Sequence, residues 1–130
     1  MSEKPEILRQ DLKKAIHNLS QLADSGLTGD VEQDAFIKRF ELCYELSWKW
    51  LQSRVFREGI AARSPRQVFK ESVSLGYIHN EKGWLEMIEI RNVLVHTYNA
   101  DKAREFTQQI RGTFLPLFME LGNMIDQSDV

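Results

Sequence analysis

Residues 36–55 read FIKRFELCYELSWKWLQSRV, and this stretch decides the fold of the chain. Its apolar residues recur at three- and four-residue steps, which is the spacing of one face of an α-helix. Two neighbouring stripes share this spacing: Phe36, Phe40, Cys43, Ser47 and Trp50 form one, and Ile37, Tyr44, Trp48, Leu51 and Val55 form the other. No other segment has so wide an apolar face. We therefore expect a helix from about Val31 to Arg57, capped by Asp30, at the centre of the core.

Four further helices are predicted by the same periodicity, because only three prolines and seven glycines interrupt the 130 residues. The expected helices span residues 6–24, 65–75, 81–97 and 101–126. Ser64 and Asn80 stand where they can cap the second and third of these helices. Short connections make successive helices antiparallel. The predicted fold class is all-α, an up-and-down four-helix bundle with one additional short helix, in a single domain over residues 1–130.

Two of these helices contain segments that argue against a simple helix. The run Val93-Leu94-Val95 alone suits a strand, but helical spacing begins a dozen residues earlier and no turn signal intervenes. We expect a helix that is buried through Trp84, Leu85, Ile88 and Val95. Pro116 lies inside the last helix and should kink it, because its ring crowds the carbonyl group of Gly112 and it has no N–H to donate.

Composition excludes several classes of protein. Apolar residues make up 42% of the chain and charged residues 28%, which is typical of a soluble globular domain. No apolar run approaches the roughly 18 residues that cross a bilayer, and the first residues, MSEKP, lack the hydrophobic segment of a secretion signal. We therefore expect a cytoplasmic protein that binds no membrane. Cys43 is the single cysteine and the three histidines are far apart, so the sequence predicts no disulfide, no metal site and no cofactor.

The charge pattern leaves one candidate surface for RNA. A net charge of −2 argues against a protein that coats nucleic acid indiscriminately, because such binding relies on many lysines and arginines. Residues 54–70 depart from this balance, with one acid, Glu58, and a local charge of +4. Their five basic residues are Arg54, Arg57, Arg63, Arg66 and Lys70. These side chains either face phosphate groups or are ordinary solvated charges, and the sequence leaves both interpretations open.

A polar motif interrupts the otherwise apolar residues 90–98, which read IRNVLVHTY. Polar groups on a buried segment need partners or a function. An arginine can stabilise a phosphoryl transition state by bidentate hydrogen bonds, and a histidine can move protons near neutral pH. Arg91 and His96 lie about 140° apart on an ideal helix, so the long arginine side chain or a loosened last turn must bring them to one phosphate. Satisfied structural polar groups are the alternative.

The spacing Arg91-Asn92-x-x-x-His96-x-Tyr98 resembles the Arg-x4-His-x-Tyr signature of HEPN domains. Other segments resemble the HepT-like branch of nucleotidyltransferase substrate-binding proteins: Arg39-Phe40-Glu41, Glu45, Trp48-Lys49, and Ser64-Pro65-Arg66 before a short helix. The similarity runs from about Asp34 to Tyr98, and the helical pattern extends it over nearly all of the chain. Several elements in the same order are more specific than the motif by itself.

This resemblance implies a homodimer in which the motif helices of two copies form one cleft, and a minimal nucleotidyltransferase as the partner antitoxin. In such toxin–antitoxin pairs, the HEPN protein is a metal-independent ribonuclease that its partner silences by transferring AMP to the motif tyrosine. Carried onto this chain, Arg91 and His96 are catalytic, Asn92 positions them or the phosphate, and Tyr98 accepts the adenylyl group. The expected substrate is RNA, either tRNA or mRNA.

The roles of two acidic residues are less defined. The resemblance carries over Glu41 and Glu45 only as framework. By spacing alone, Glu45 can pair with Lys49 four residues later, on a solvated ridge of the long second helix.

Two other functions fit the same motif. The first is a non-catalytic subunit that presents a substrate or nucleotide to a minimal nucleotidyltransferase, with Arg91 and His96 lining an anion pocket. A sequence pI near 5.9 fits this function slightly better than a free nuclease. The second is a helical bundle whose polar motif only holds a dimer interface together. The intact mass of the protein, made with and without its neighbouring gene, separates these functions, because AMP added at Tyr98 supports the regulated toxin.

Overall fold

The computed structural model describes residues 5–97 and 99–127, and every regular element within them is helical. In chain order they are α1 (Pro5–Asp24), α2 (Asp30–Arg57), α3 (Pro65–Ser74), α4 (Glu81–Val95), α5 (Ala100–Arg104), α6 (Thr107–Gln109), the π-helical segment η1 (Ile110–Phe114) and α7 (Leu115–Gln127). The predicted all-α helical bundle is confirmed. Among the described residues, no helix is long and apolar enough to cross a membrane.

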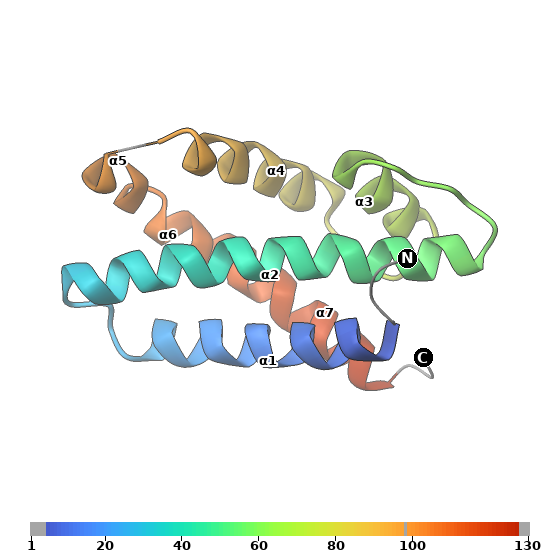
Figure 1. The fold of residues 1–130 in the computed structure, drawn as a ribbon, viewed down its shortest axis with the longest axis horizontal. Helices are drawn as coiled ribbons and strands as arrows, with labels where there is room; N and C mark the ends of the chain where they lie inside the picture. The colour runs from blue at the N-terminus through green and yellow to red at the C-terminus, as the bar shows by residue number, and fades with distance from the viewer. Residues whose placement is uncertain (1–4, 98, 128–130) are drawn as a thin grey trace.

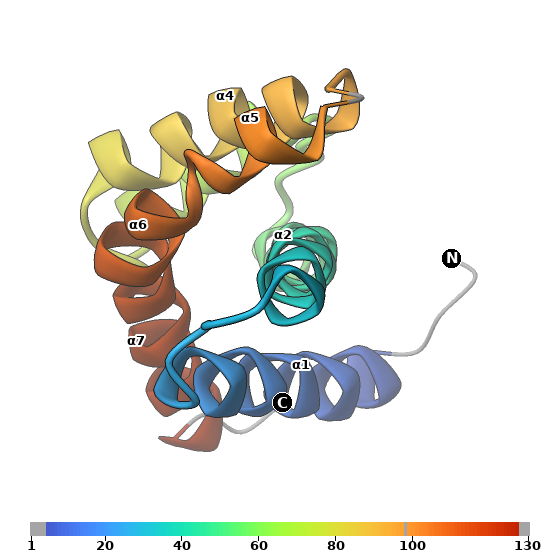
Figure 2. The same cartoon turned by 90° about the vertical axis from the view of Figure 1, so that its left-hand side faces the viewer.

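The long helix α2 lies at the centre of the bundle, as the pattern of residues 36–55 predicted. Figure 2 views α2 end-on and shows α1 on one side of it, α4 on the opposite side and α7 on a third side. α1 and α2 lie side by side and run in opposite directions (Figure 1). Six apolar residues of α2 have no exposed surface: Phe36, Phe40, Cys43, Trp50, Leu51 and Val55. Three other apolar residues of α2, Val31, Leu42 and Phe56, are more than half exposed.

Aromatic side chains connect α2 to the other helices in a closed circuit. Ring centroids lie 6.1 Å apart for Tyr44 and Phe69, 4.9 Å for Phe69 and Trp84, 5.7 Å for Trp84 and Phe118, and 6.1 Å for Phe118 and Phe40. Phe40 and Tyr44 are one turn apart on α2, which closes the circuit. Such pairs stabilise by about 0.5–1.5 kcal/mol each beyond the area that they bury. The circuit therefore fixes α3, α4 and α7 relative to α2.

Two of the three predicted helix caps are confirmed. The hydroxyl of Ser64 accepts a hydrogen bond from the backbone N–H of Gln67 at 3.2 Å, and the side-chain oxygen of Asn80 accepts one from Gly83 at 3.1 Å. The expectation that Asp30 caps α2 is wrong. Gly29, in an extended conformation, is the N-cap, and Asp30 is the first helical residue, where its charge still faces the positive end of the helix.

The helix α4 ends two residues earlier than predicted. It stops at Val95, and the N–H groups of His96 and Thr97 bond to carbonyl groups three residues back. The choice of helix over strand is confirmed, but the expectation that Val95 is buried is wrong. Val95 is 46% exposed, and Leu94 is the residue that enters the core. In the turn after α4, His96 is no longer held to the ideal helical angle from Arg91.

The last predicted helix is divided into four pieces. At Glu105 and Phe106, backbone N–H groups bond to carbonyl groups three residues back, which separates α5 from α6. The distortion expected at Pro116 takes the form of η1, in which the N–H of Leu115 bonds to the carbonyl oxygen of Ile110, five residues back. A wider π-helical turn here accommodates a proline that cannot donate to the carbonyl group of Gly112. The predicted distortion near Pro116 is thus present, whereas the break between α5 and α6 was not predicted.

Candidate functional site

Arg91 is fixed between α4 and α2. Its Nη2 donates a hydrogen bond to Oε1 of Glu45 at 2.8 Å, and its guanidinium carbon lies 5.4 Å from the centre of the Tyr44 ring. Glu45 Oε2 also accepts a hydrogen bond from Nε1 of Trp48 at 3.3 Å. The side chain of Arg91 is 32% exposed. An ion pair on one edge and an aromatic ring on one face therefore orient a guanidinium that solvent still reaches.

The aromatic platform under Arg91 stays neutral. Burial raises the pKa of Tyr44 to about 12, the positive charge of Arg91 acts in the opposite direction, and Glu45 raises the pKa further. Tyr44 is thus protonated throughout the neutral range. It offers Arg91 the face of a ring, and Glu45 supplies the negative charge.

The other motif residues lie at the surface. Asn92 is exposed, and its side-chain oxygen accepts a hydrogen bond from Arg91 Nη1 at 3.4 Å. His96 is exposed in the turn that ends α4, and the hydroxyl of Thr97 donates to the carbonyl oxygen of Val93 at 2.7 Å. Tyr98 lies outside the described residues. Neither Arg91 nor His96 is sealed in the interior, so both are accessible to a ligand.

Comparison with known proteins identifies the family of this chain. The family described as "Nucleotidyltransferase substrate binding protein like" matches residues 9–127. The chain belongs to this family. The HepT-like HEPN assignment that the motif suggested is confirmed by this match and by a curated relative, the probable ribonuclease HepT of Haemophilus influenzae.

Two similar proteins match this chain at nearly the same sequence identity but over different fractions of its length. The Haemophilus protein is 30% identical over 79 residues, which cover 57% of this chain and 54% of the relative, so the match spans about half the length of that protein. A crystal structure of a protein from Thermus thermophilus superimposes with a TM-score of 0.76 at 29% identity, over 88% of this chain and 98% of the other. The helical fold is therefore shared over nearly the whole length of the Thermus protein.

The candidate basic patch of this family member is partly neutralised by α4. Arg66 pairs with Glu89 at 3.2 Å, and Lys70 lies 3.7 Å from a carboxylate oxygen of Glu81. Arg54 is half-buried, with its guanidinium carbon 5.3 Å from the centres of both the Trp50 and the Tyr77 rings, while Arg57 and Arg63 are exposed. The local charge of +4 was calculated from residues 54–70 alone. It therefore left out Glu81 and Glu89 of α4, which lie beside this patch in the fold.

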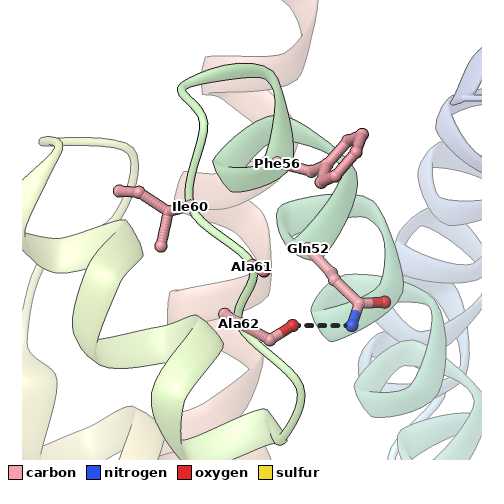
Figure 3. A pocket seen from close by; sticks show the side chains of 5 residues that line it. All are labelled: Gln52, Phe56, Ile60, Ala61 and Ala62. Atoms are coloured by element: carbon pink, nitrogen blue, oxygen red, sulfur yellow. Dashed lines mark hydrogen bonds between the residues drawn. The ribbon is translucent and has the colours of Figure 1, made fainter.

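Two surface cavities lie at opposite ends of α2. One, of about 220 Å³, lies beside its C-terminal end and is lined by Gln52, Phe56, Ile60, Ala61 and Ala62. Figure 3 shows this cavity and the hydrogen bond that the Gln52 amide donates to the carbonyl oxygen of Ala62 at 2.8 Å. The other, of about 240 Å³, lies next to the motif and is lined by Asp34, Ile37, Lys38, Glu41, Leu94, Thr97 and Ala103. Among the described residues, no group of histidine, cysteine and acidic side chains is arranged to hold a metal ion.

The sequence did not reveal which residues support Arg91. Spacing suggested that Glu45 pairs with Lys49, but in the described structure Glu45 pairs with Arg91, 46 residues away. Tyr44 and Trp48 were assigned only to the apolar stripe of α2. The signal available in the sequence was the position of Glu45 beside that stripe, where a carboxylate borders the core and needs a partner.

Proposed function

We propose that this protein is a metal-independent endoribonuclease in which Arg91 and His96 act on an RNA phosphodiester. The observation that carries the proposal is the orientation of Arg91. Glu45 and Tyr44 hold its guanidinium, its side chain is still partly exposed, and its helix ends at Val95, directly before His96. Support also comes from the family and from a relative named as a probable ribonuclease. The substrate is tRNA or mRNA.

The chemistry needs only groups of the protein and of the RNA. His96 takes the proton of a ribose 2′-hydroxyl, and the 2′-oxygen attacks the neighbouring phosphorus atom. The bond from phosphorus to the 5′-oxygen breaks, and that oxygen receives a proton from water. The products are a 2′,3′-cyclic phosphate and a free 5′-hydroxyl. Arg91 stabilises the negative charge on the phosphoryl oxygens during the attack, and Asn92 orients the guanidinium through their hydrogen bond.

The proposal includes two protein partners. A second copy of the chain completes the cleft, and a minimal nucleotidyltransferase acts as the antitoxin. The nucleotidyltransferase silences the ribonuclease when the hydroxyl of Tyr98 loses its proton and attacks the α-phosphorus of ATP, which attaches AMP and releases pyrophosphate. The family description, which names nucleotidyltransferase substrate binding, supports such a partner.

A second function competes, and one observation favours it. Glu45 neutralises Arg91 at 2.8 Å, and the acids of α4 neutralise part of the basic patch, so the surface offers an RNA backbone fewer free positive charges than the sequence suggested. A non-catalytic subunit that binds a nucleotide and presents it to a nucleotidyltransferase needs less positive charge. It predicts tight association with that enzyme and nucleotide binding without turnover.

The deciding experiment uses protein made without the nucleotidyltransferase and shown by intact mass to carry no AMP. Wild type, His96→Ala and the control His17→Ala, which changes an exposed histidine on α1, are incubated with tRNA and mRNA in EDTA. We expect wild type and His17→Ala to leave cyclic phosphate ends and His96→Ala to leave the RNA intact. Intact RNA with all three proteins, together with nucleotide binding, would favour the non-catalytic subunit.

A further inference from the structure

The cavity beside the motif has a small volume and a partly apolar lining. Its volume of about 240 Å³ lies below the roughly 300 Å³ at which pockets for drug-sized ligands begin. Ile37 and Leu94, each 6% exposed, and Ala103 provide apolar walls. Thr97, which lines the cavity, directly follows His96 in the chain. A ring bound here thus lies beside the turn that carries His96.

The charges around this cavity fit an uncharged ring better than a phosphate group. Lys38 lies 3.8 Å from Glu41, and Arg104 lies 3.2 Å from Asp34, so each acid of the lining has a base beside it. No net positive charge remains among these four side chains to attract a phosphate. Apolar walls and a carboxylate at the edge are suited to the faces and the hydrogen-bonding edge of a nucleobase.

Glu41 is the carboxylate of this cavity that a ligand can use. Both oxygens of Asp34 already accept hydrogen bonds from Arg104, each at 3.3 Å. Glu41 is 25% exposed, and its ion-pair contact with the exposed Lys38, at 3.8 Å, exceeds the length of a hydrogen bond. A partly buried carboxylate gains by accepting charge-assisted hydrogen bonds from a ligand.

The four RNA bases differ in the hydrogen-bond donors on their Watson–Crick edges, so a carboxylate can distinguish them. A carboxylate has two acceptor oxygens side by side, which match two adjacent donors. On its Watson–Crick edge, guanine presents N1–H and an amino group next to each other. Adenine and cytosine place a ring acceptor beside their amino group, and uracil flanks one donor with two acceptors. One of the carboxylate oxygens therefore faces a lone pair on each of these three bases.

We propose that this cavity is a guanine-binding subsite in which Glu41 reads the Watson–Crick edge of the nucleotide next to the cleaved phosphate. This inference rests on the proposed ribonuclease function and assigns it a sequence preference. Glu41 is a specificity residue here, because it contacts the base and takes no part in the bond that breaks.

The test measures binding separately from cleavage. The 3′-monophosphates of the four nucleosides are titrated into the unmodified protein by calorimetry, because these compounds cannot be cleaved. We expect guanosine 3′-monophosphate to bind about tenfold tighter than the others, as a bidentate contact to one base edge provides. Glu41→Gln should abolish the preference for guanosine 3′-monophosphate, since an amide offers one acceptor and one donor side by side, and every base has such a pair on its Watson–Crick edge. Glu120→Gln, an exposed residue of α7, should leave it unchanged.

Cleavage sites in a mixed-sequence RNA are mapped with the same three proteins. Equal binding of the four nucleotides, or cleavage by wild type without enrichment of guanosine beside the cut, would overturn the guanine subsite and leave the ribonuclease intact. Guanine-selective binding that Glu41→Gln alters, without cleavage of any RNA, would retain the subsite and overturn the ribonuclease.

Discussion

Arg91 and Glu45 are 46 residues apart in the sequence, yet their side chains meet at 2.8 Å between α4 and α2. Each is about one-third exposed, so water screens the pair and its net contribution to folding stability is small. Its consequence is geometric. The carboxylate fixes one edge of the guanidinium, and the direction in which the remaining N–H groups point follows from the packing of two helices.

The first prediction concerns this pair. Glu45→Gln removes the charge that orients Arg91 while keeping the shape of the side chain, so RNA cleavage by the proposed ribonuclease should fall by about tenfold. The free energy of unfolding should change by less than about 1 kcal/mol. Single-turnover cleavage and urea unfolding measure the two quantities. Glu120→Gln, which removes an exposed acid of α7 that contacts His79, is the control and should leave cleavage unchanged. Loss of stability and activity in parallel would show that Glu45 only supports the fold.

The second prediction concerns stability at alkaline pH. Burial raises the pKa of Cys43 from 9.0 to about 12 and that of Tyr44 from 10.0 to about 12. Both groups are neutral when protonated, so the folded state holds these protons more tightly than the unfolded chain. Their stabilising effect is complete below pH 9 and is lost as the pH rises toward 12.

Urea unfolding at a series of pH values measures this loss. Tyr44→Phe should flatten the decline above pH 10, because it removes one of the two groups whose pKa burial raises. A wild-type free energy of unfolding that stays constant from pH 8 to pH 11 would contradict the prediction.

The third prediction concerns the close approach of α4 to α7. A Cβ atom at Gly83 would lie 3.0 Å from a methyl carbon of Leu117 and 2.7 Å from the side-chain nitrogen of Asn80. Gly83→Ala should therefore destabilise the protein by about 1–3 kcal/mol through crowding and a disturbed cap. Gly112→Ala, where a Cβ meets nothing within 4 Å, should be neutral or slightly stabilising. Thermal unfolding of the two variants, compared at equal concentration, measures the difference, and equal midpoints would refute the crowding.

The fourth prediction concerns the attachment of α5. No residue of α5 is buried, and Arg104, 18% exposed, pairs with Asp30, Asp34 and Asp101. Arg104→Ala should release α5, so amide hydrogen exchange in residues 100–104 should speed up while exchange in α1 and α7 stays unchanged. Lys102→Ala, on the same helix, is the control. Unchanged protection in Arg104→Ala would show that backbone contacts hold α5 instead.

The sequence was sufficient for the bundle but not for its irregularities. Apolar spacing in residues 36–55 predicted the central helix because burial of one face is a local pattern that every turn repeats. The division of the last helix was not visible, because the sequence showed that Pro116 distorts the backbone but not that a π-helical turn absorbs the distortion. The cap at Gly29 was missed because Asp30 is the stronger capping residue by type.

The sequence predicted the motif residues of the candidate site but not the residues that surround them. Arg91, Asn92 and His96 stand out as polar residues on an apolar segment. Their neighbours come from α2, and only helix packing brings them together, so no spacing rule reveals the pair of Glu45 with Arg91. The same holds for the cavity at Glu41, whose walls come from α2, from the end of α4 and from α5.

The aromatic circuit connects the packing of the core to the orientation of Arg91 at the surface. Tyr44 is at once a member of the ring that joins four helices and the platform on which Arg91 rests. Phe69 contacts the Tyr44 ring directly, so we expect a change of side-chain size at Phe69 to move this platform and the guanidinium that rests on it. A substitution in the core can therefore alter the exposed motif through a single tyrosine, without changing any residue of the motif itself.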